Sequence, residues 1–171
     1  MGCSGTKLTP IKGLSRSEEF IVATERKLGL AKVPFSVFRQ AVKKYGYKGL
    51  LQESHLREIA REINLDFEQL HVANSEVARV YKSERLLDTG GNYVVREFLH
   101  LGFLLCNHTS EKSQVKEAWN MMNPLLDDSI SKDRLILFYE ELAHIAVDMR
   151  LSIETAKDQA PEDVVKYLHR I

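Results

Sequence analysis

Three breaks of about twelve residues interrupt a chain whose other segments repeat apolar residues at three- and four-residue spacing. Each break follows an amphipathic segment and leads into the next one; the three span residues 44–55, 86–97 and 123–134. Their eighth positions are all apolar, namely Leu51, Tyr93 and Ile130. These positions are 42 and 37 residues apart, a spacing typical of repeated helix–loop–helix units. The chain is therefore expected to fold as such units in series.

The apolar spacing predicts an all-α protein of about seven to eight helices. Ser17 caps a first helix that Gly29 ends, Pro34 begins a second, and Pro161 fits the first turn of the last. The helices between them are expected over about 56–63, 67–87, 94–106, 115–122 and 132–149. No sustained two-residue alternation indicates a sheet.

The breaks resemble the loops of the EF-hand family, the calmodulin-like helix–loop–helix proteins. Gly49 and Gly91 stand at the sharp-turn sixth position, and Glu97-Phe98 stands where the family has its closing Glu and an apolar residue. Residues 118–123 are similar to the family's approach to a loop. The resemblance covers roughly residues 33–149 and implies paired units: a first EF-hand-like lobe over 16–108 and a second, more degenerate one over 109–171.

Calcium ligands are largely missing from these loops. Calcium requires six to eight oxygens, with side chains from positions 1, 3 and 5 and a bidentate Glu at 12. At these positions the first loop has Lys44, Gly46, Lys48 and His55. The second loop has Leu86, Asp88, Gly90 and Glu97, and the third has Asn123, Leu125, Asp127 and Arg134. We expect no cofactor and no calcium; Asp88 and Glu97 are the candidate ligands if any ion binds.

The first residues, Met-Gly-Cys-Ser-Gly-Thr, fit the pattern for N-myristoylation of Gly2. Cys3 would then be a site for S-palmitoylation, since one acyl chain alone binds membranes only marginally. This start resembles that of the calflagins, dually acylated EF-hand proteins of the flagellar membrane, and so does Glu97-Phe98-Leu99 through Leu104-Leu105-Cys106. The resemblance implies the inner leaflet of a ciliary or flagellar membrane. The alternative is a small, flexible arm over residues 1–15 that matches a short pattern by chance.

The formal net charge is zero, but it is unevenly distributed. Residues 1–50 hold ten basic and three acidic side chains, and the rest hold fourteen and twenty-one. The balanced total and the absence of a nucleic-acid motif exclude a nucleic-acid-coating protein. The basic stretch is either a solvated face or a contact surface for anionic lipid or an acidic polymer such as a microtubule; it comprises Arg26, Lys27, Lys32, Arg39, Lys43, Lys44 and Lys48.

No catalytic constellation emerges from the sequence. The six histidines show no metal-ligand spacing, and Cys106 lies in an apolar run, where a thiol packs as a small hydrophobe. Two cysteines without a secretory signal favour the cytoplasmic side. No apolar run approaches the roughly 20 residues of a transmembrane helix. We therefore expect a non-catalytic protein.

The expected function is a binding module, in one of three forms. The first is an adaptor anchored by acyl groups on Gly2 and Cys3, the second a structural component of a ciliary axoneme or microtubule assembly, and the third a residual calcium sensor. Trp119, Met121 and Met122 either line a groove for a partner helix or pack in the core. With Lys43, Lys44 and Lys48, they are the candidate partner-binding residues.

The acylation hypothesis predicts the mass of the protein isolated from its native cell. We expect loss of Met1 and the addition of one or two acyl chains, with both chains lost in a Gly2→Ala variant because palmitoylation of Cys3 needs prior membrane contact. Intact-mass spectrometry measures this directly. An unmodified mass, or membrane partitioning that survives Gly2→Ala, would contradict the hypothesis.

Overall fold

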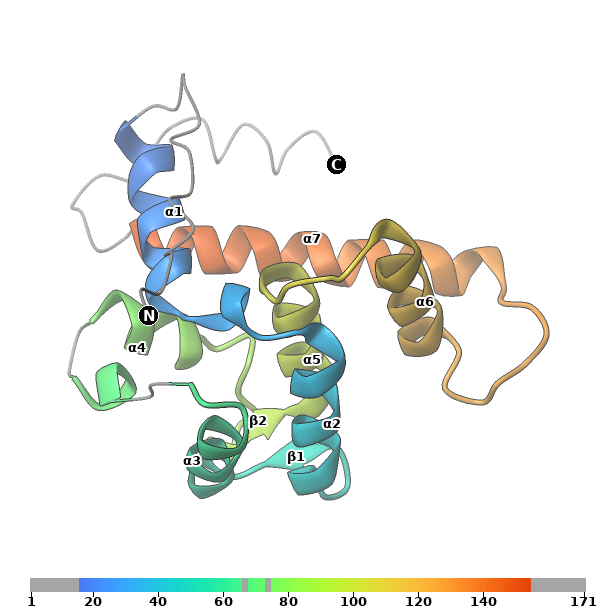
Figure 1. Ribbon diagram of the computed structural model, residues 1–171, viewed down its shortest axis with the longest axis horizontal. Coiled ribbons are helices and arrows are strands. Elements are labelled where there is room, and N and C mark those ends of the chain that lie inside the picture. The colour runs from blue at the N-terminus through green and yellow to red at the C-terminus, as the bar shows by residue number, and fades with distance from the viewer. Residues whose placement is uncertain (1–15, 66–67, 73–74, 155–171) are drawn as a thin grey trace, which may run out of the picture.

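The computed structural model describes residues 16–65, 68–72 and 75–154; Gly2, Cys3 and the helix predicted after Pro161 lie outside these residues. The described chain is mostly helical, which confirms the all-α prediction (Figure 1). Within it, no helix has the length and apolar character needed to cross a membrane. The elements are α1 (Arg16–Lys27), η1 (Leu30–Lys32), α2 (Phe35–Tyr45), β1 (Leu50–Leu51), α3 (Glu53–Glu62), η2 (Glu68–His71), α4 (Glu76–Tyr81), β2 (Tyr93–Val94), α5 (Val95–Leu105), α6 (Glu111–Met122) and α7 (Lys132–Glu154).

Two short strands join the first two loops. β1 pairs antiparallel with β2, and Leu51 lies opposite Tyr93, so the eighth positions of the two loops meet. Gly49 and Gly91 have φ values of 79° and 75°, a region that glycine enters without steric cost. The units α2–loop–α3 and α4–loop–α5 thus share one small sheet. Sequence alternation does not reveal strands of two residues, which explains why no sheet was expected.

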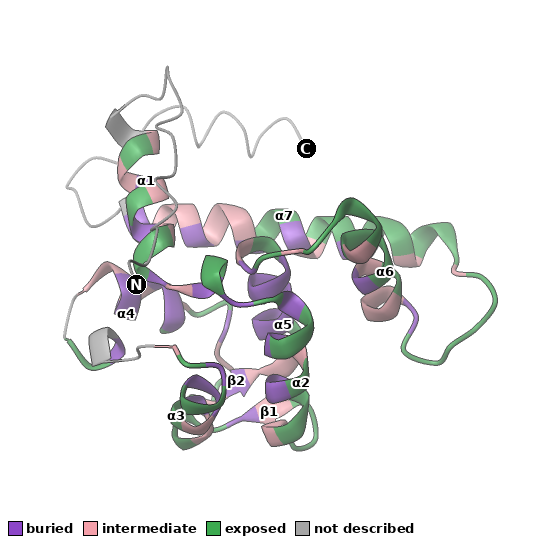
Figure 2. Ribbon diagram, in the orientation of Figure 1, coloured by how far each residue is buried: buried purple, intermediate pink, exposed green. Residues whose placement is uncertain are grey.

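The core lies between these units, where buried residues gather (Figure 2). It contains a cluster of aromatic rings. The Phe98 ring centroid is 5.4 Å from that of Phe38, 5.7 Å from Tyr93 and 6.1 Å from Tyr81. At Gly102, a Cβ atom would overlap the ring of Phe38. The close approach of α2 to α5 therefore depends on a glycine in the middle of α5.

Helix α7 is the longest element and packs against α5, α4 and α1 (Figure 1). Its buried side chains recur at three- and four-residue spacing, which forms one apolar stripe: Phe138, Leu142, Ile145, Met149 and Ile153. The stripe includes Ile153, so the helix continues past Met149, where the sequence predicted its end. Residues beyond the expected lobe boundary at 108 are thereby packed onto the first two units.

The prediction of one long helix over 67–87 is wrong. The described part of this segment contains only the short helices η2 and α4. Ser75 begins α4 as its N-cap, because its hydroxyl accepts a hydrogen bond from the Ala78 N–H at 3.0 Å. Downstream of Tyr81 the chain turns, and Leu86 is buried. The spacing of apolar residues is the same for one long helix and for a short helix followed by a loop that buries Leu86. Spacing alone therefore did not distinguish these two structures.

The third loop folds differently from the first two. The side chain of Asn123 closes it, accepting from the Asp127 N–H at 3.0 Å and donating to the Asp127 carbonyl at 2.6 Å. Its positive φ, 61°, falls on Leu126 rather than on the sixth position, Asp128. Ile130 belongs to neither strand. Helices α6 and α7 therefore form a unit whose loop has no strand partner within the described residues.

Candidate partner-binding groove

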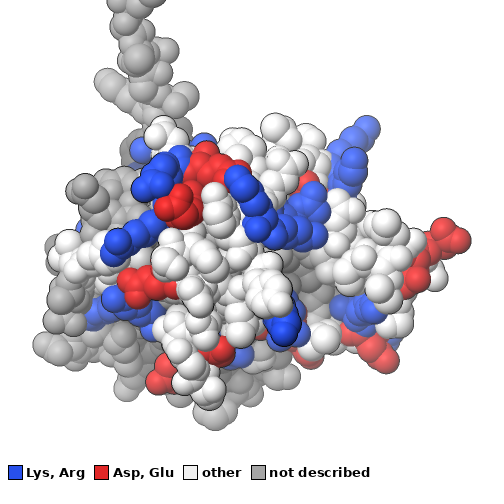
Figure 3. Space-filling model, turned by 90° about the horizontal axis from the view of Figure 1, so that it is seen from below, with Lys and Arg blue, Asp and Glu red and all other residues white. Residues whose placement is uncertain are grey.

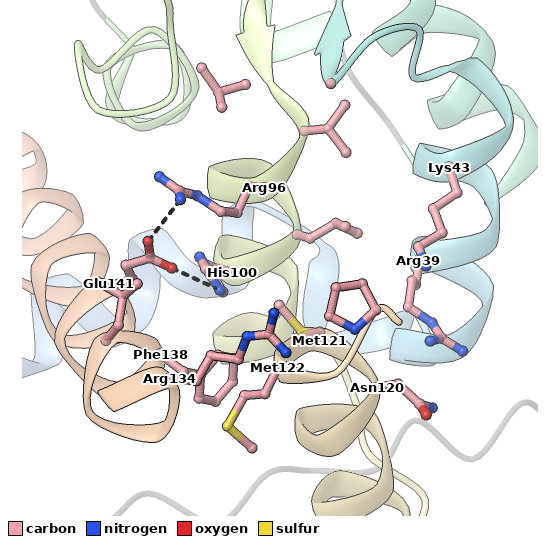
Figure 4. A pocket seen from close by; sticks show the side chains of 16 residues that line it. Arg39, Lys43, Arg96, His100, Asn120, Met121, Met122, Arg134, Phe138 and Glu141 are labelled. Carbon is pink, nitrogen blue, oxygen red and sulfur yellow. Dashed lines mark ion pairs between the residues drawn. The ribbon is translucent and has the colours of Figure 1, made fainter. Parts of the chain in front are cut away.

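A cavity of about 580 Å³ opens between α2, the start of α5, α6 and the first half of α7 (Figure 4). We call it the central groove. Most of its lining is apolar: Val94, Val95, Leu99, Met121, Met122, Pro124, Leu137 and Phe138. The other lining residues are Arg39, Lys43, Gly49, Arg96, His100, Asn120, Arg134 and Glu141. Concave sites with an apolar lining and a few polar groups are typical of ligand-binding surfaces.

The groove exists because α6 and α7 do not bury all of their apolar side chains. Phe138 is 4% exposed, whereas its neighbour Leu137 is 50% exposed. Met121 and Met122, in the last turn of α6, are half-buried and pack only at the edge of the core. Methionine side chains adapt their shape readily, which suits them to a surface that receives another molecule.

A network of charged side chains lies along the floor of the groove, between α5 and α7. Arg96 contacts Glu97 at 2.9 Å and Glu141 at 3.0 Å. The buried His100 ring lies between the same carboxylates, with Nε2 at 3.6 Å from Glu141 and Nδ1 at 4.0 Å from Glu97. The His100 ring and the Arg96 guanidinium lower the pKa of Glu97. The network therefore links α5 to α7 by opposite charges.

Positive charge dominates the polar lining. Arg39, Lys43, Arg96 and Arg134 line the groove, and Glu141 is the one acid among the described lining residues. On the face drawn in Figure 3, several Lys and Arg side chains lie close together across the middle of the molecule, with Asp and Glu at their edges.

The structure brings together three of the six predicted partner-binding residues. Lys43, Met121 and Met122 line the central groove. Trp119 does not line it and is 37% exposed. Lys44 pairs with Glu62 at 2.7 Å, and the Lys48 ammonium lies 5.3 Å from the centroid of the Tyr47 ring. These three side chains therefore lie outside the site.

Several lining residues were not predicted from the sequence: Arg39, which was assigned only to the general basic stretch, and Arg96, His100, Arg134, Leu137, Phe138 and Glu141. One signal could have identified the α7 part of the groove. Residues 135–139 are five consecutive apolar residues in a helix, so they surround the helix axis and cannot all face one core. The remaining residues come together only through helix packing.

The two candidate calcium ligands are each engaged by other groups of the protein. The Asp88 carboxylate accepts hydrogen bonds from the N–H groups of Asn92 at 2.8 Å and Gly90 at 2.9 Å. These bonds, that with Asn92 first, lower the pKa of Asp88. Glu97 instead pairs with Arg96, and Leu86 at position 1 is 2% exposed in the core. Among the described residues, no group of three or more His, Cys, Asp or Glu side chains is placed to hold a metal ion.

The charge network predicts a pH dependence of stability. Because the pKa of Glu97 is lowered on folding, the stabilisation it gives is present above its ordinary pKa of 4.5 and is lost as the pH falls through the lowered value. A Glu97→Gln variant should lose about 1–3 kcal/mol of unfolding free energy at pH 7. Its urea-unfolding curve should approach that of the wild type as the pH falls below 4.5 and through the lowered pKa, where Glu97 of the folded wild type becomes protonated.

Four charged groups face or influence Glu97, namely Arg96, His100, Glu141 and Arg85, and they are unchanged in this variant. The exposed Glu140 provides a matched control, since Glu140→Gln should leave both stability and its pH profile unchanged. An equal effect of both substitutions, or a Glu97→Gln deficit that persists unchanged at low pH, would contradict the role of the network.

Comparison of the chain with protein-family models, with curated proteins and with solved structures finds no match. Inference about function therefore rests on the side chains of the protein itself. The groove places accessible apolar side chains, among them the half-exposed Leu137, beside charged side chains. That combination is characteristic of a surface that binds another molecule.

Proposed function

We propose that this protein is a non-catalytic, EF-hand-like adaptor that binds a protein partner in its central groove without calcium. In this proposal it is anchored to a cytoplasmic or ciliary membrane by acyl groups on Gly2 and Cys3. The observation that carries the proposal is the groove itself, whose apolar side chains Met121, Met122 and Leu137 remain accessible. Exposed apolar surface costs free energy and is retained where a partner covers it.

Exposed apolar side chains near the groove support a protein partner rather than a small molecule. They lie on α6, the third loop and the first half of α7: Val115, Trp119, Leu125, Leu126, Leu135, Ile136 and Tyr139. Such a spread exceeds what a small molecule in one cavity would cover, whereas protein interfaces involve about 20–30 residues a side.

The EF-hand assignment is supported by the register of the two strands. The sequence resemblance places Leu51 and Tyr93 at the same loop position, and these residues lie opposite each other in the sheet. The sixth-position glycines, Gly49 and Gly91, have the positive φ that the sharp turn requires.

Binding without calcium is supported by what occupies the ligand positions. The second loop is already closed by the bonds from Gly90 and Asn92 to Asp88. The buried Leu86 and the paired Glu97 leave no set of oxygens that could converge on an ion. The first loop carries the ammonium groups of Lys44 and Lys48 at ligand positions. These features favour the adaptor over a residual calcium sensor.

A non-catalytic role is supported by the state of the one described thiol. Burial raises the pKa of Cys106 to about 12, so this cysteine is a protonated thiol near neutral pH rather than a nucleophilic thiolate. It packs with the apolar core.

A component of a microtubule assembly is the second candidate, and the excess of cations around the groove favours it. The exterior of such a polymer is acidic, and Lys43 and Arg134 would contact it by charge complementarity. Which of the two forms is correct depends on the identity of the partner in the cell.

Photo-crosslinking from the groove tests the proposal and identifies that partner. Replacing Leu137 by a photoreactive phenylalanine analogue in the native cell should give a crosslinked protein, because its side chain is half exposed in the groove. The matched control is Ala143, which is exposed on the same helix but outside the groove. A membrane-associated product supports the adaptor, and an axonemal product supports the second candidate. Equal labelling from both positions, or none from Leu137, would overturn the groove as a protein-binding site.

Calorimetric titration tests calcium independence. We expect no heat of binding at about 1 mM calcium, which is far above the dissociation constants of EF-hand sensor sites, and no change in Tm between calcium and chelator. Saturable heat that disappears in Asp88→Ala would instead establish the residual sensor, since only an ion bound in the second loop needs that carboxylate.

A further inference from the structure

Some cationic side chains around the central groove form close ion pairs within the protein and others do not. The cations without close partners indicate which charge a binding partner would carry. Arg39 contacts Glu117 at 3.2 Å, and Arg96 contacts both Glu97 and Glu141. These two cations are therefore neutralised by α5, α6 and α7. The inference below rests on the proposed function, because it concerns the occupant of the same groove.

Two cations of the groove are left for an external partner. Lys43 is exposed on α2 and forms no ion pair among the described residues. Arg134, at the start of α7, is 3.7 Å from Asp127, and these two side chains are 40% and 55% exposed. An ion pair of this kind contributes little, so the guanidinium remains available. The two residues belong to the helices that flank the groove (Figure 4).

The shape of the site selects a helix rather than an extended peptide. An extended peptide binds by adding a strand to an exposed sheet edge. Here each strand is only two residues long, so the sheet offers too few backbone groups to hold such a peptide. The groove instead offers apolar side chains from α5, α6 and α7, and its volume of about 580 Å³ accommodates a few large apolar side chains. A helix presents such side chains from one face at three- and four-residue spacing.

We propose that the occupant of the central groove is an amphipathic helix of a protein partner with carboxylates on both sides of its apolar stripe. Its apolar side chains contact Leu99, Met122 and Leu137. Its carboxylates pair with Lys43 on one side and Arg134 on the other. The charge preference follows from Lys43, which forms no ion pair among the described residues, and from Arg134, whose pair with Asp127 is long at 3.7 Å.

Three synthetic peptides of equal length and helicity test this with the full protein. The first carries Leu and Met at helical spacing flanked by Glu, the second replaces every Glu by Lys, and the third keeps the Glu residues but scrambles the apolar positions. Binding is measured by fluorescence anisotropy of labelled peptide at low salt. We expect the first peptide to bind about tenfold more tightly than the second, as two rim ion pairs allow. The third should not bind measurably.

A protein variant with reversed charges tests whether the preference for the Glu-flanked peptide arises from the groove. The double variant Lys43→Glu/Arg134→Glu should lose the preference for the Glu-flanked peptide and favour the Lys-flanked one. The matched control, Lys32→Glu/Arg57→Glu, changes net charge equally at two exposed positions outside the groove and should keep the wild-type preference. All four side chains are exposed or half-exposed, so both variants are expected to keep the wild-type Tm.

The outcomes distinguish this inference from the proposed function. If no helical peptide binds the wild type, the groove is not a helix-docking site and the inference fails, whereas the proposed function fails only if crosslinking from Leu137 captures no protein. If the Lys-flanked peptide binds equally or better, or if the control reversal changes the preference as much, only the charge inference fails. Co-sedimentation with phosphatidylserine vesicles that is lost in Lys43→Glu/Arg134→Glu but kept in the control would assign the groove to membrane lipid and overturn the inference.

Discussion

The antiparallel pairing of Leu51 with Tyr93 is the contact on which the rest of the described structure depends. It joins two loops that are distant in sequence, with a supporting backbone bond from the Val95 N–H to the Gly49 carbonyl at 2.8 Å. Within the second loop, the Val94 N–H donates to the Leu86 carbonyl at 2.9 Å. Once the loops are joined, α2, α3, α4 and α5 enclose one aromatic core. That core fixes the surface of α5 on which α7 packs, and hence the floor of the groove.

The second loop is stabilised by its own side chains. Asp88 accepts hydrogen bonds from the loop's N–H groups, and Leu86 buries an apolar side chain at the first loop position. Full burial of a leucine contributes about 1.5–3 kcal/mol, and it removes an oxygen that an ion would need. A loop built in this way holds its shape without a ligand, so the two helix–loop–helix units form a constant scaffold for the groove.

The groove arises from a mismatch between α7 and the core it covers. The later part of α7 fits the core with a single stripe, whereas residues 135–139 near its start are apolar all round and only Phe138 among these five is buried. Helix α6 covers part of this excess but leaves Met121, Met122 and Leu137 accessible. The same region carries Lys43 and Arg134, so apolar and electrostatic attraction act on one partner at one place.

Much of the fold could be predicted because its signals are local. Helical spacing, the glycines at 49 and 91, and the common frame of Leu51 and Tyr93 depend on neighbouring residues, and they determined the helical class and the first two loops. The candidate site was predicted only in Lys43, Met121 and Met122. Arg39, Arg96, His100 and Arg134 have no common spacing, since they come from three helices whose approach depends on a glycine at 102 and on the apolar stripe of α7. The sequence by itself determined which segments become helices and loops. The tertiary structure decided which charged side chains come into contact, because helix packing brings together residues whose spacing along the chain does not indicate that they are neighbours.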